Sequence, residues 1–194
     1  MKNIGRLLLR VSVGGFFFGH GTQKLFGWFG GHGLDATANM FESLGMRPGK
    51  RNALAAGAAE AGGGAAIVAG AATPLAASAL VATMLTAIHR VHLKNGPWVT
   101  GGGYEYNVVL ITALLTLVEA GPGSPSIDHA RGKEHSGSAW VLATLALAAA
   151  GAAGAHLAAE ATPAPAQDTP AVPASADPEA AGATQPEAGV SAQG

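Results

Sequence analysis

The sequence predicts an all-α membrane protein: a transmembrane four-helix bundle followed by a fifth C-terminal helix and a disordered tail. Hydrophobic residues make up 48% of the 194 residues and charged residues only 12%, whereas soluble domains average about 25% charged residues. Mean hydropathy is positive, at +0.28. Four stretches reach or approach the roughly 17 residues that a tilted helix needs to cross hydrocarbon, namely residues 4–29, 53–72, 74–91 and 104–120.

The first stretch is expected to remain in the protein as a spanning helix. Lys2 and Arg6 precede a run of leucines, which is how many secretory signals begin. Arg10 then interrupts the apolar run, no small-residue cleavage site follows, and the hydrophobicity continues to Phe29. These features favour a retained helix over a cleaved signal.

The C-terminal part differs in composition from the bundle. Residues 139–158 are rich in Ala and Leu and predict a fifth helix, either a further crossing or a surface helix. From residue 161 the chain holds Pro, Ala, Thr, Gln and acidic residues without Lys or Arg, which is typical of disorder. We therefore expect a bundle domain over 1–128, a linker and fifth helix over 129–160, and a tail over 161–194.

Glu60 is the most informative single residue. The stretch 53–72 contains no other charged residue, and a carboxylate inside a bilayer is costly unless it is paired or protonated. Such a group usually marks a working site. The stretch is mostly Ala and Gly, so its assignment to the membrane depends on its neighbours.

The other polar groups of the bundle are predicted to gather near Glu60. At about 1.5 Å rise per residue, His20 and Glu60 fall at similar depth in antiparallel helices. Arg6, Arg10, His20 and Lys24 share an arc of about 80° on the first helix, so this stripe is expected to face Glu60. Alternatively, Arg6 and Lys24 extend to the two membrane interfaces.

Small residues predict where the first two helices approach. Gly15 and Gly19 form a G-x-x-x-G pair, and Gly62, Gly63 and Gly64 follow Glu60. Such glycines let the backbones of membrane helices come close.

The connection at residues 89–107 is expected to place His89, His92 and Glu105 in the same half of the bilayer as Glu60. Two histidines three residues apart are a weak metal signal, and no metal site is predicted. Aromatic residues around it fit a membrane-interface belt: Phe26, Trp28, Phe29, Trp98, Tyr104 and Tyr106. The chain has no Cys, so it has no thiolate chemistry or iron–sulfur ligation, and redox chemistry would require a bound cofactor or a partner.

Several segments, in this order, resemble the DoxX family of small bacterial membrane proteins. They are RLLLRVSVGGFFFGHGTQKLFGWFGGHGL (6–34), FESLGM (41–46), AEAGGG (59–64), VHLKNG (91–96), GGGYEYN (101–107) and GPGSPSID (121–128). The resemblance implies a four-helix bundle in the bacterial inner membrane, described as an oxidoreductase, with quinone-coupled oxidation of sulfur compounds in some relatives. It maps the family's polar signature onto Arg10, His20, Lys24, Glu60, His92, Glu105 and Asn107.

These observations lead to a hypothesis of a quinone-linked membrane oxidoreductase or oxidoreductase subunit. Glu60 and Glu105 would exchange protons, while Arg10, His20, Lys24, His92 and Asn107 would bind a quinone-like or small anionic ligand. The expected partners are the lipid bilayer and a soluble redox protein, with no nucleic acid.

Two other functions stay open, as does whether the protein is an enzyme. One is a non-enzymatic anchor or scaffold for soluble redox partners, in which Arg10, Glu60 and His20 form a structural network. The other is a small transporter. Basic residues fall on both sides of the membrane, so the positive-inside rule does not decide the orientation, and a cytoplasmic amino terminus is preferred because the first helix usually dominates.

Overall fold

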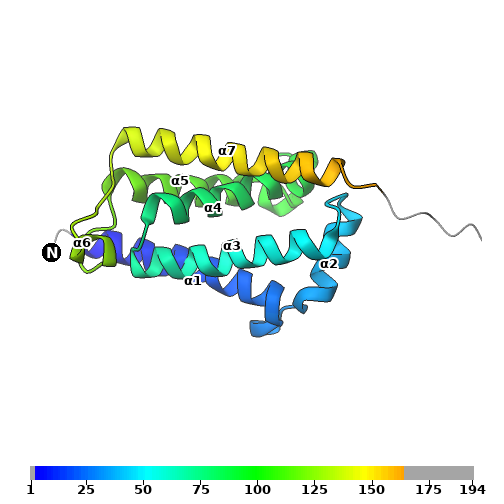
Figure 1. Ribbon diagram of the computed structural model, residues 1–194, viewed down its shortest axis with the longest axis horizontal. Coiled ribbons are helices and arrows are strands. Elements are labelled where there is room, and N and C mark those ends of the chain that lie inside the picture. The colour runs from blue at the N-terminus through cyan, green and yellow to red at the C-terminus, as the bar shows by residue number, and fades with distance from the viewer. Residues whose placement is uncertain (1–2, 164–194) are drawn as a thin grey trace, which may run out of the picture. The chain divides into compact units, whose positions relative to one another are not determined.

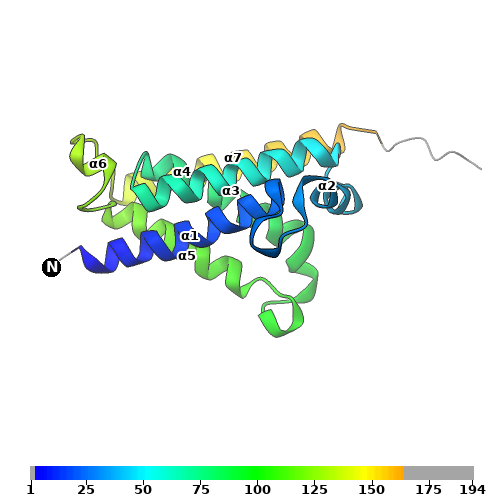
Figure 2. The same ribbon diagram turned by 90° about the horizontal axis from the view of Figure 1, so that it is seen from below.

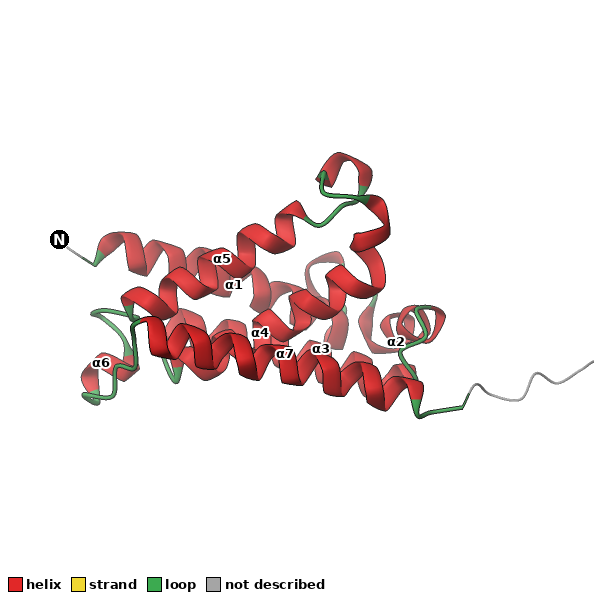
Figure 3. Ribbon diagram, turned by 90° about the horizontal axis from the view of Figure 1, so that it is seen from above, coloured by secondary structure: helices red, strands yellow, loops and turns green. Residues whose placement is uncertain are grey.

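The computed structural model describes residues 3–163 of the chain (Figure 1). Over these residues the protein contains only helices and connecting turns, which confirms the predicted all-α class (Figure 3). Residues 1–2 and 164–194 are outside the described range. The predicted tail over 161–194 therefore lies almost wholly beyond the described residues.

Five long helices occupy the positions of the five predicted ones. The first four are α1 (Ile4–Phe26), α3 (Gly49–Ala69), α4 (Thr73–Ala87) and α5 (Glu105–Ala120), and the fifth is α7 (Ser138–Glu160). Helix α1 packs on α3, α3 on α4, α4 on α5, and α5 on α1, which closes a four-helix bundle (Figures 1 and 2). Helix α7 packs against α4 and α5 from outside this bundle.

Shorter elements connect the long helices. Helix α2 (Gly33–Ser43) joins α1 to α3 and packs on α3. Helix α2 was not predicted, because this segment has no long apolar run. The other short elements are η1 (Trp28–Gly30), the π-helical turn η2 (Ile88–His92), η3 (Leu93–Asn95), η4 (Val99–Gly101) and α6 (Ile127–Ala130).

Helices α1 and α3 approach closely through glycines. Gly64 was among the glycines predicted for this contact, whereas Gly21 was not. A Cβ atom at Gly21 would collide with the backbone of Ala61, and one at Gly64 would collide with the backbone of Phe18. Gly15 and Gly19, by contrast, have nothing within 4 Å of a Cβ position. The predicted G-x-x-x-G pair therefore faces away from α3, because the helix turns a different side to its neighbour.

The surface and the core of the described residues fit a lipid environment. Large apolar side chains are exposed on several helices, among them Leu8, Phe16, Leu75, Leu142 and Leu157. Soluble monomers rarely expose so much apolar surface. The fully buried side chains include Ile67, Leu80, Val81, Leu114, Leu117 and Val118.

Two helical segments are long and apolar enough to cross a membrane by length and composition. They are Thr73–Asn95, which joins α4 to η2 and η3, and Ser138–Glu160, which is α7. Helix α5 has only 16 residues, and α1 carries three basic residues. Crossings by α1, α3 and α5 therefore remain predictions. Helices α3 and α5 pack on α4, and α1 packs on α3 and α5.

Candidate functional site

The bundle has two different ends. We call the end that holds the start of α1, the end of α5 and α6 the closed end, and the end that holds α2 and η2 the open end (Figure 1). At the closed end, Arg6 Nη1 donates to the carbonyl of Ala120 at 2.8 Å, which joins α1 to α5. Toward the open end these two helices diverge (Figure 2).

Arg10 lies at the closed end and is only 3% exposed. Its guanidinium donates four hydrogen bonds of 2.6–3.1 Å to main-chain carbonyls, those of Ile67, Val68, Pro122 and Pro125. These bonds join the last turn of α3 to the segment after α5. The predicted pairing of Arg10 with Glu60 is not made, and Arg10 does not line the cavity described below.

Asp128 completes the closed end and was not singled out from the sequence. Its carboxylate accepts from the backbone of Ala72 at 2.8 Å and of Thr73 at 3.0 Å, and from the Thr73 hydroxyl at 2.9 Å. Free N–H groups at the start of a helix need such acceptors, so Asp128 caps the beginning of α4.

The open end contains a cavity of about 490 Å³. Side chains of α1, α3, α4, η2 and α5 surround it, together with residues of α2 and α7. Most of them are apolar, such as Phe17, Met40, Met84 and Leu110. Cavities of roughly 300–1,000 Å³ with apolar walls and a few polar groups are typical small-molecule sites.

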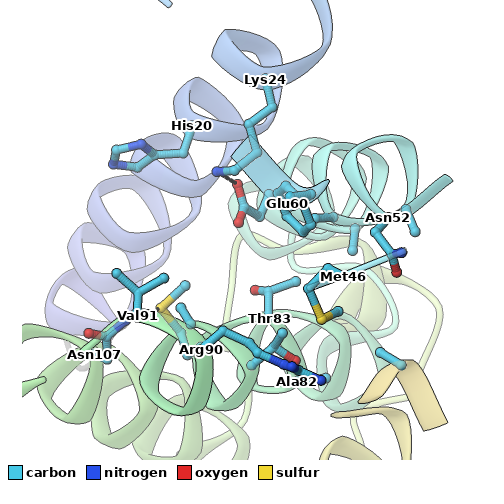
Figure 4. A pocket seen from close by; sticks show the side chains of 18 of the residues that line it. His20, Lys24, Met46, Asn52, Glu60, Ala82, Thr83, Arg90, Val91 and Asn107 are labelled. Carbon is cyan, nitrogen blue, oxygen red and sulfur yellow. Dashed lines mark hydrogen bonds and ion pairs between the residues drawn. The ribbon is translucent and has the colours of Figure 1, made fainter. Parts of the chain in front are cut away.

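Lys24 and Glu60 form an ion pair in the wall of this cavity (Figure 4). The side chain of Glu60 is 6% exposed and that of Lys24 is 23% exposed. A buried carboxylate needs a partner of opposite charge, and the stripe on α1 supplies it. The expectation that this stripe meets Glu60 therefore holds for Lys24.

Three further predicted residues line the cavity: His20, His92 and Asn107. His20 is exposed at the rim, and its ring points away from the ion pair (Figure 4). The His92 Nδ1–H donates to the carbonyl of Gly102 at 2.7 Å. The amide of Asn107 lies 3.3 Å from the sulfur of Met84.

Glu105 does not line the cavity, although it was predicted as a catalytic residue. Its carboxylate accepts from the backbone N–H of Val99 at 2.9 Å. It thereby holds the glycine-rich connection in place at the start of α5.

Arg90 is the main cavity residue that the sequence analysis did not choose. It comes from η2, and its Nε donates to Nδ1 of His156 on α7 at 2.8 Å. Its position near the end of a membrane-length apolar segment, Thr73–Asn95, is the sequence signal that could have identified it. Among residues 3–163, no group of three or more His, Asp or Glu side chains is placed to hold a metal ion.

The helical bundle, its exposed apolar surface and its cavity together define a small helical membrane protein with a ligand-sized site between helices. Residues 5–93 match the model of the DoxX family, which covers α1 to η2. This match supports membership of the DoxX family of membrane proteins, which the sequence resemblance predicted. No curated protein and no solved structure matches the chain.

Proposed function

We propose that the protein is a quinone-linked membrane oxidoreductase, or the quinone-binding subunit of one, and that the open-end cavity is the quinone site. The observation that carries this proposal is an apolar cavity with the Lys24–Glu60 ion pair in its wall. A membrane quinone combines an apolar tail with a ring that carries two oxygen acceptors. Apolar walls suit the tail and ring, and a buried cation suits one oxygen.

The cavity is accessible from the side of the bundle. Phe16 on α1 is 62% exposed and Tyr106 on α5 is 48% exposed, and both line the cavity. Its mouth therefore lies between these two helices, where they diverge. In a bilayer, this position would let a lipid-soluble ligand enter from the membrane.

Reduction of a quinone to a quinol consumes two electrons and two protons. In this proposal a soluble redox protein, which oxidises its own substrate, supplies both electrons. Lys24 donates a hydrogen bond to a quinone oxygen, Glu60 exchanges the proton with Lys24, and exposed His20 relays protons from solvent. The chain itself has no Cys to hold an iron–sulfur cluster, which is why the electron donor is placed on a partner.

We also infer that the protein lies in the bacterial inner membrane with its amino terminus in the cytoplasm. The open end then lies toward the outer face. Because the chain contains no Cys, a single cysteine at Lys94 reports the side of this end in intact cells. Labelling by a membrane-impermeant maleimide is expected, and protection from it would reverse the orientation.

The quinone site is tested by binding of decylubiquinone to the detergent-purified full chain, measured by calorimetry. Glu60→Gln removes the carboxylate, and we expect loss of quinone-dependent turnover and at least about tenfold weaker binding. Glu119→Gln is the matched control, because Glu119 is exposed at the closed end and its carboxylate accepts a hydrogen bond from the exposed Ser138 hydroxyl. Binding and turnover that survive Glu60→Gln unchanged would contradict the proposal.

A further inference from the structure

The cavity has a second polar end, which is built by the π-helical turn η2. Arg90, Val91 and His92 are consecutive residues, and all three line the cavity. A π-turn widens the helix, and such turns recur at functional sites.

The hydrogen bonds of Arg90 leave part of its guanidinium unused. Nε donates to His156, but Nη2 is buried and has no hydrogen-bond partner among the described residues. The nearest carboxylate oxygen, on Glu160, is 3.8 Å from Nη2, and that side chain is 67% exposed. Nη1 also makes no hydrogen bond among the described residues, and it is not buried, so the guanidinium keeps a donor that an acceptor from a ligand can reach.

The charges that line the cavity do not balance. They are those of Lys24, Glu60 and Arg90. Lys24 and Glu60 neutralise each other, whereas the counter-ion of Arg90 is Glu160, which lies outside the cavity lining, 3.8 Å from Nη2, and is 67% exposed. His156 adds no charge, because its Nδ1 accepts a hydrogen bond from Arg90 and is therefore unprotonated. A cation beside an apolar space whose counter-ion is exposed to solvent attracts a further anionic group.

We propose that Arg90 binds an anionic oxygen of the cavity's ligand. The ligand class is an apolar aromatic molecule with one ionised oxygen substituent, such as a hydroxyquinone in its anionic form. Arg90 lies across the cavity from the Lys24–Glu60 pair, so one molecule can meet both polar ends (Figure 4). The inference rests on the proposed function, since it specifies which quinones the site prefers.

The test compares two probes of nearly equal shape on the detergent-purified full chain. 2-Hydroxy-1,4-naphthoquinone is ionised at neutral pH, and 2-methoxy-1,4-naphthoquinone is neutral. We expect the ionised probe to bind at least about tenfold more tightly, the size of a charge-assisted hydrogen bond. Arg90→Gln is expected to remove this preference and to leave binding of the methoxy probe within about threefold.

Two further variants serve as a control and as a conservative substitution. Arg51→Gln is the matched control, because Arg51 is exposed at the same end, bonds to the carbonyls of Arg47 and Ala158, and does not line the cavity. It is expected to keep the preference. Arg90→Lys keeps the charge without the planar fork, and we expect it to keep part of the preference for the ionised probe. This variant tests the role of Arg90 if Arg90→Gln does not fold.

A third probe, 2-naphthoate, separates this inference from the proposed function. Equal binding of the two naphthoquinones to the wild type, or a preference that survives Arg90→Gln, overturns the anion site and leaves the quinone proposal standing. Arg90-dependent binding of 2-naphthoate without binding of either naphthoquinone supports the anion site and contradicts the quinone proposal. Failure of all three probes to bind overturns both.

Discussion

The two ends of the bundle use the same residue type in opposite ways. At the closed end, Arg10 is saturated by four carbonyls of the protein itself. At the open end, the Arg90 guanidinium makes a single hydrogen bond, to His156, and its ion-pair partner Glu160 is largely exposed. Charged groups within membranes mark either a structural joint or a working site. A structural joint therefore differs from a working site in how fully the protein's own hydrogen bonds satisfy the charged group.

The carboxylates repeat this contrast. Asp128 accepts three hydrogen bonds at the start of α4, whereas Glu60 has a single cationic partner in a cavity wall. We therefore expect substitutions at the closed end to change stability, and substitutions at the open end to change ligand binding more than stability.

The largest effect is expected for Arg10→Met. It removes the donor of the Val68, Pro122 and Pro125 carbonyls, whereas the Ile67 carbonyl keeps the N–H of Gly70. Each unsatisfied group costs about 1–3 kcal/mol, so we expect a loss of at least about 3 kcal/mol in the free energy of unfolding. Denaturant titration in detergent measures it. Arg10→Lys is expected to recover only part, because an ammonium lacks the fork that serves several carbonyls. If Arg10→Met were as stable as the wild type, Arg10 would have no structural role.

Substitution of the ion pair is expected to rank second. Glu60→Leu leaves Lys24 without its partner, and we expect a loss of about 2 kcal/mol, reduced because Lys24 is partly exposed. The double variant Lys24→Met with Glu60→Leu is expected to regain most of this stability without regaining quinone binding. Binding by the stable double variant would show that the pair is structural only.

A smaller effect is expected at the contact between α1 and α3. Gly21→Ala places a methyl group against the backbone of Ala61, with an expected loss of about 1–2 kcal/mol. Gly19→Ala is the matched control, because nothing lies within 4 Å of its Cβ position. Thermal unfolding compares them, and equal stabilities would contradict the close approach of these helices.

The smallest effect is expected for Glu105→Ala. The Val99 N–H loses its acceptor, with an expected cost of about 0.5–1.5 kcal/mol confined to the connection before α5. Hydrogen exchange at Val99 measures this loosening. Quinone-dependent turnover is expected to stay within about twofold, since Glu105 does not line the cavity. A tenfold fall in turnover would contradict this expectation and support the catalytic role predicted for Glu105 from the sequence.

The fold was predictable because length and apolar composition identify spanning helices. The stretches 53–72 and 104–120 correspond to α3 and α5, with boundary errors of a few residues. Helix α2 and the π-turn η2 carry no such signal, because a short polar helix and a widened turn depend on tertiary packing.

The site was predictable where its geometry follows helical phase. The contact between Lys24 and Glu60 was predictable, because helical phase gives the polar stripe on α1 and the rise per residue gives the depth of both side chains. The partners of Arg10 and Glu105 are main-chain groups, which no pattern of side chains reveals. The acceptors of Arg10 lie as far as 115 residues along the chain, so only the folded structure brings them together.

The most direct test of the central claim is where a ligand binds. An azido-substituted quinone is cross-linked to the full chain in detergent, and the labelled peptides are identified by mass spectrometry. The account predicts labels on residues that line the open-end cavity, such as Met84 and Tyr106, and their suppression by excess decylubiquinone. Labels concentrated at the closed end around Arg10 and Asp128, or labelling that decylubiquinone does not suppress, would contradict it.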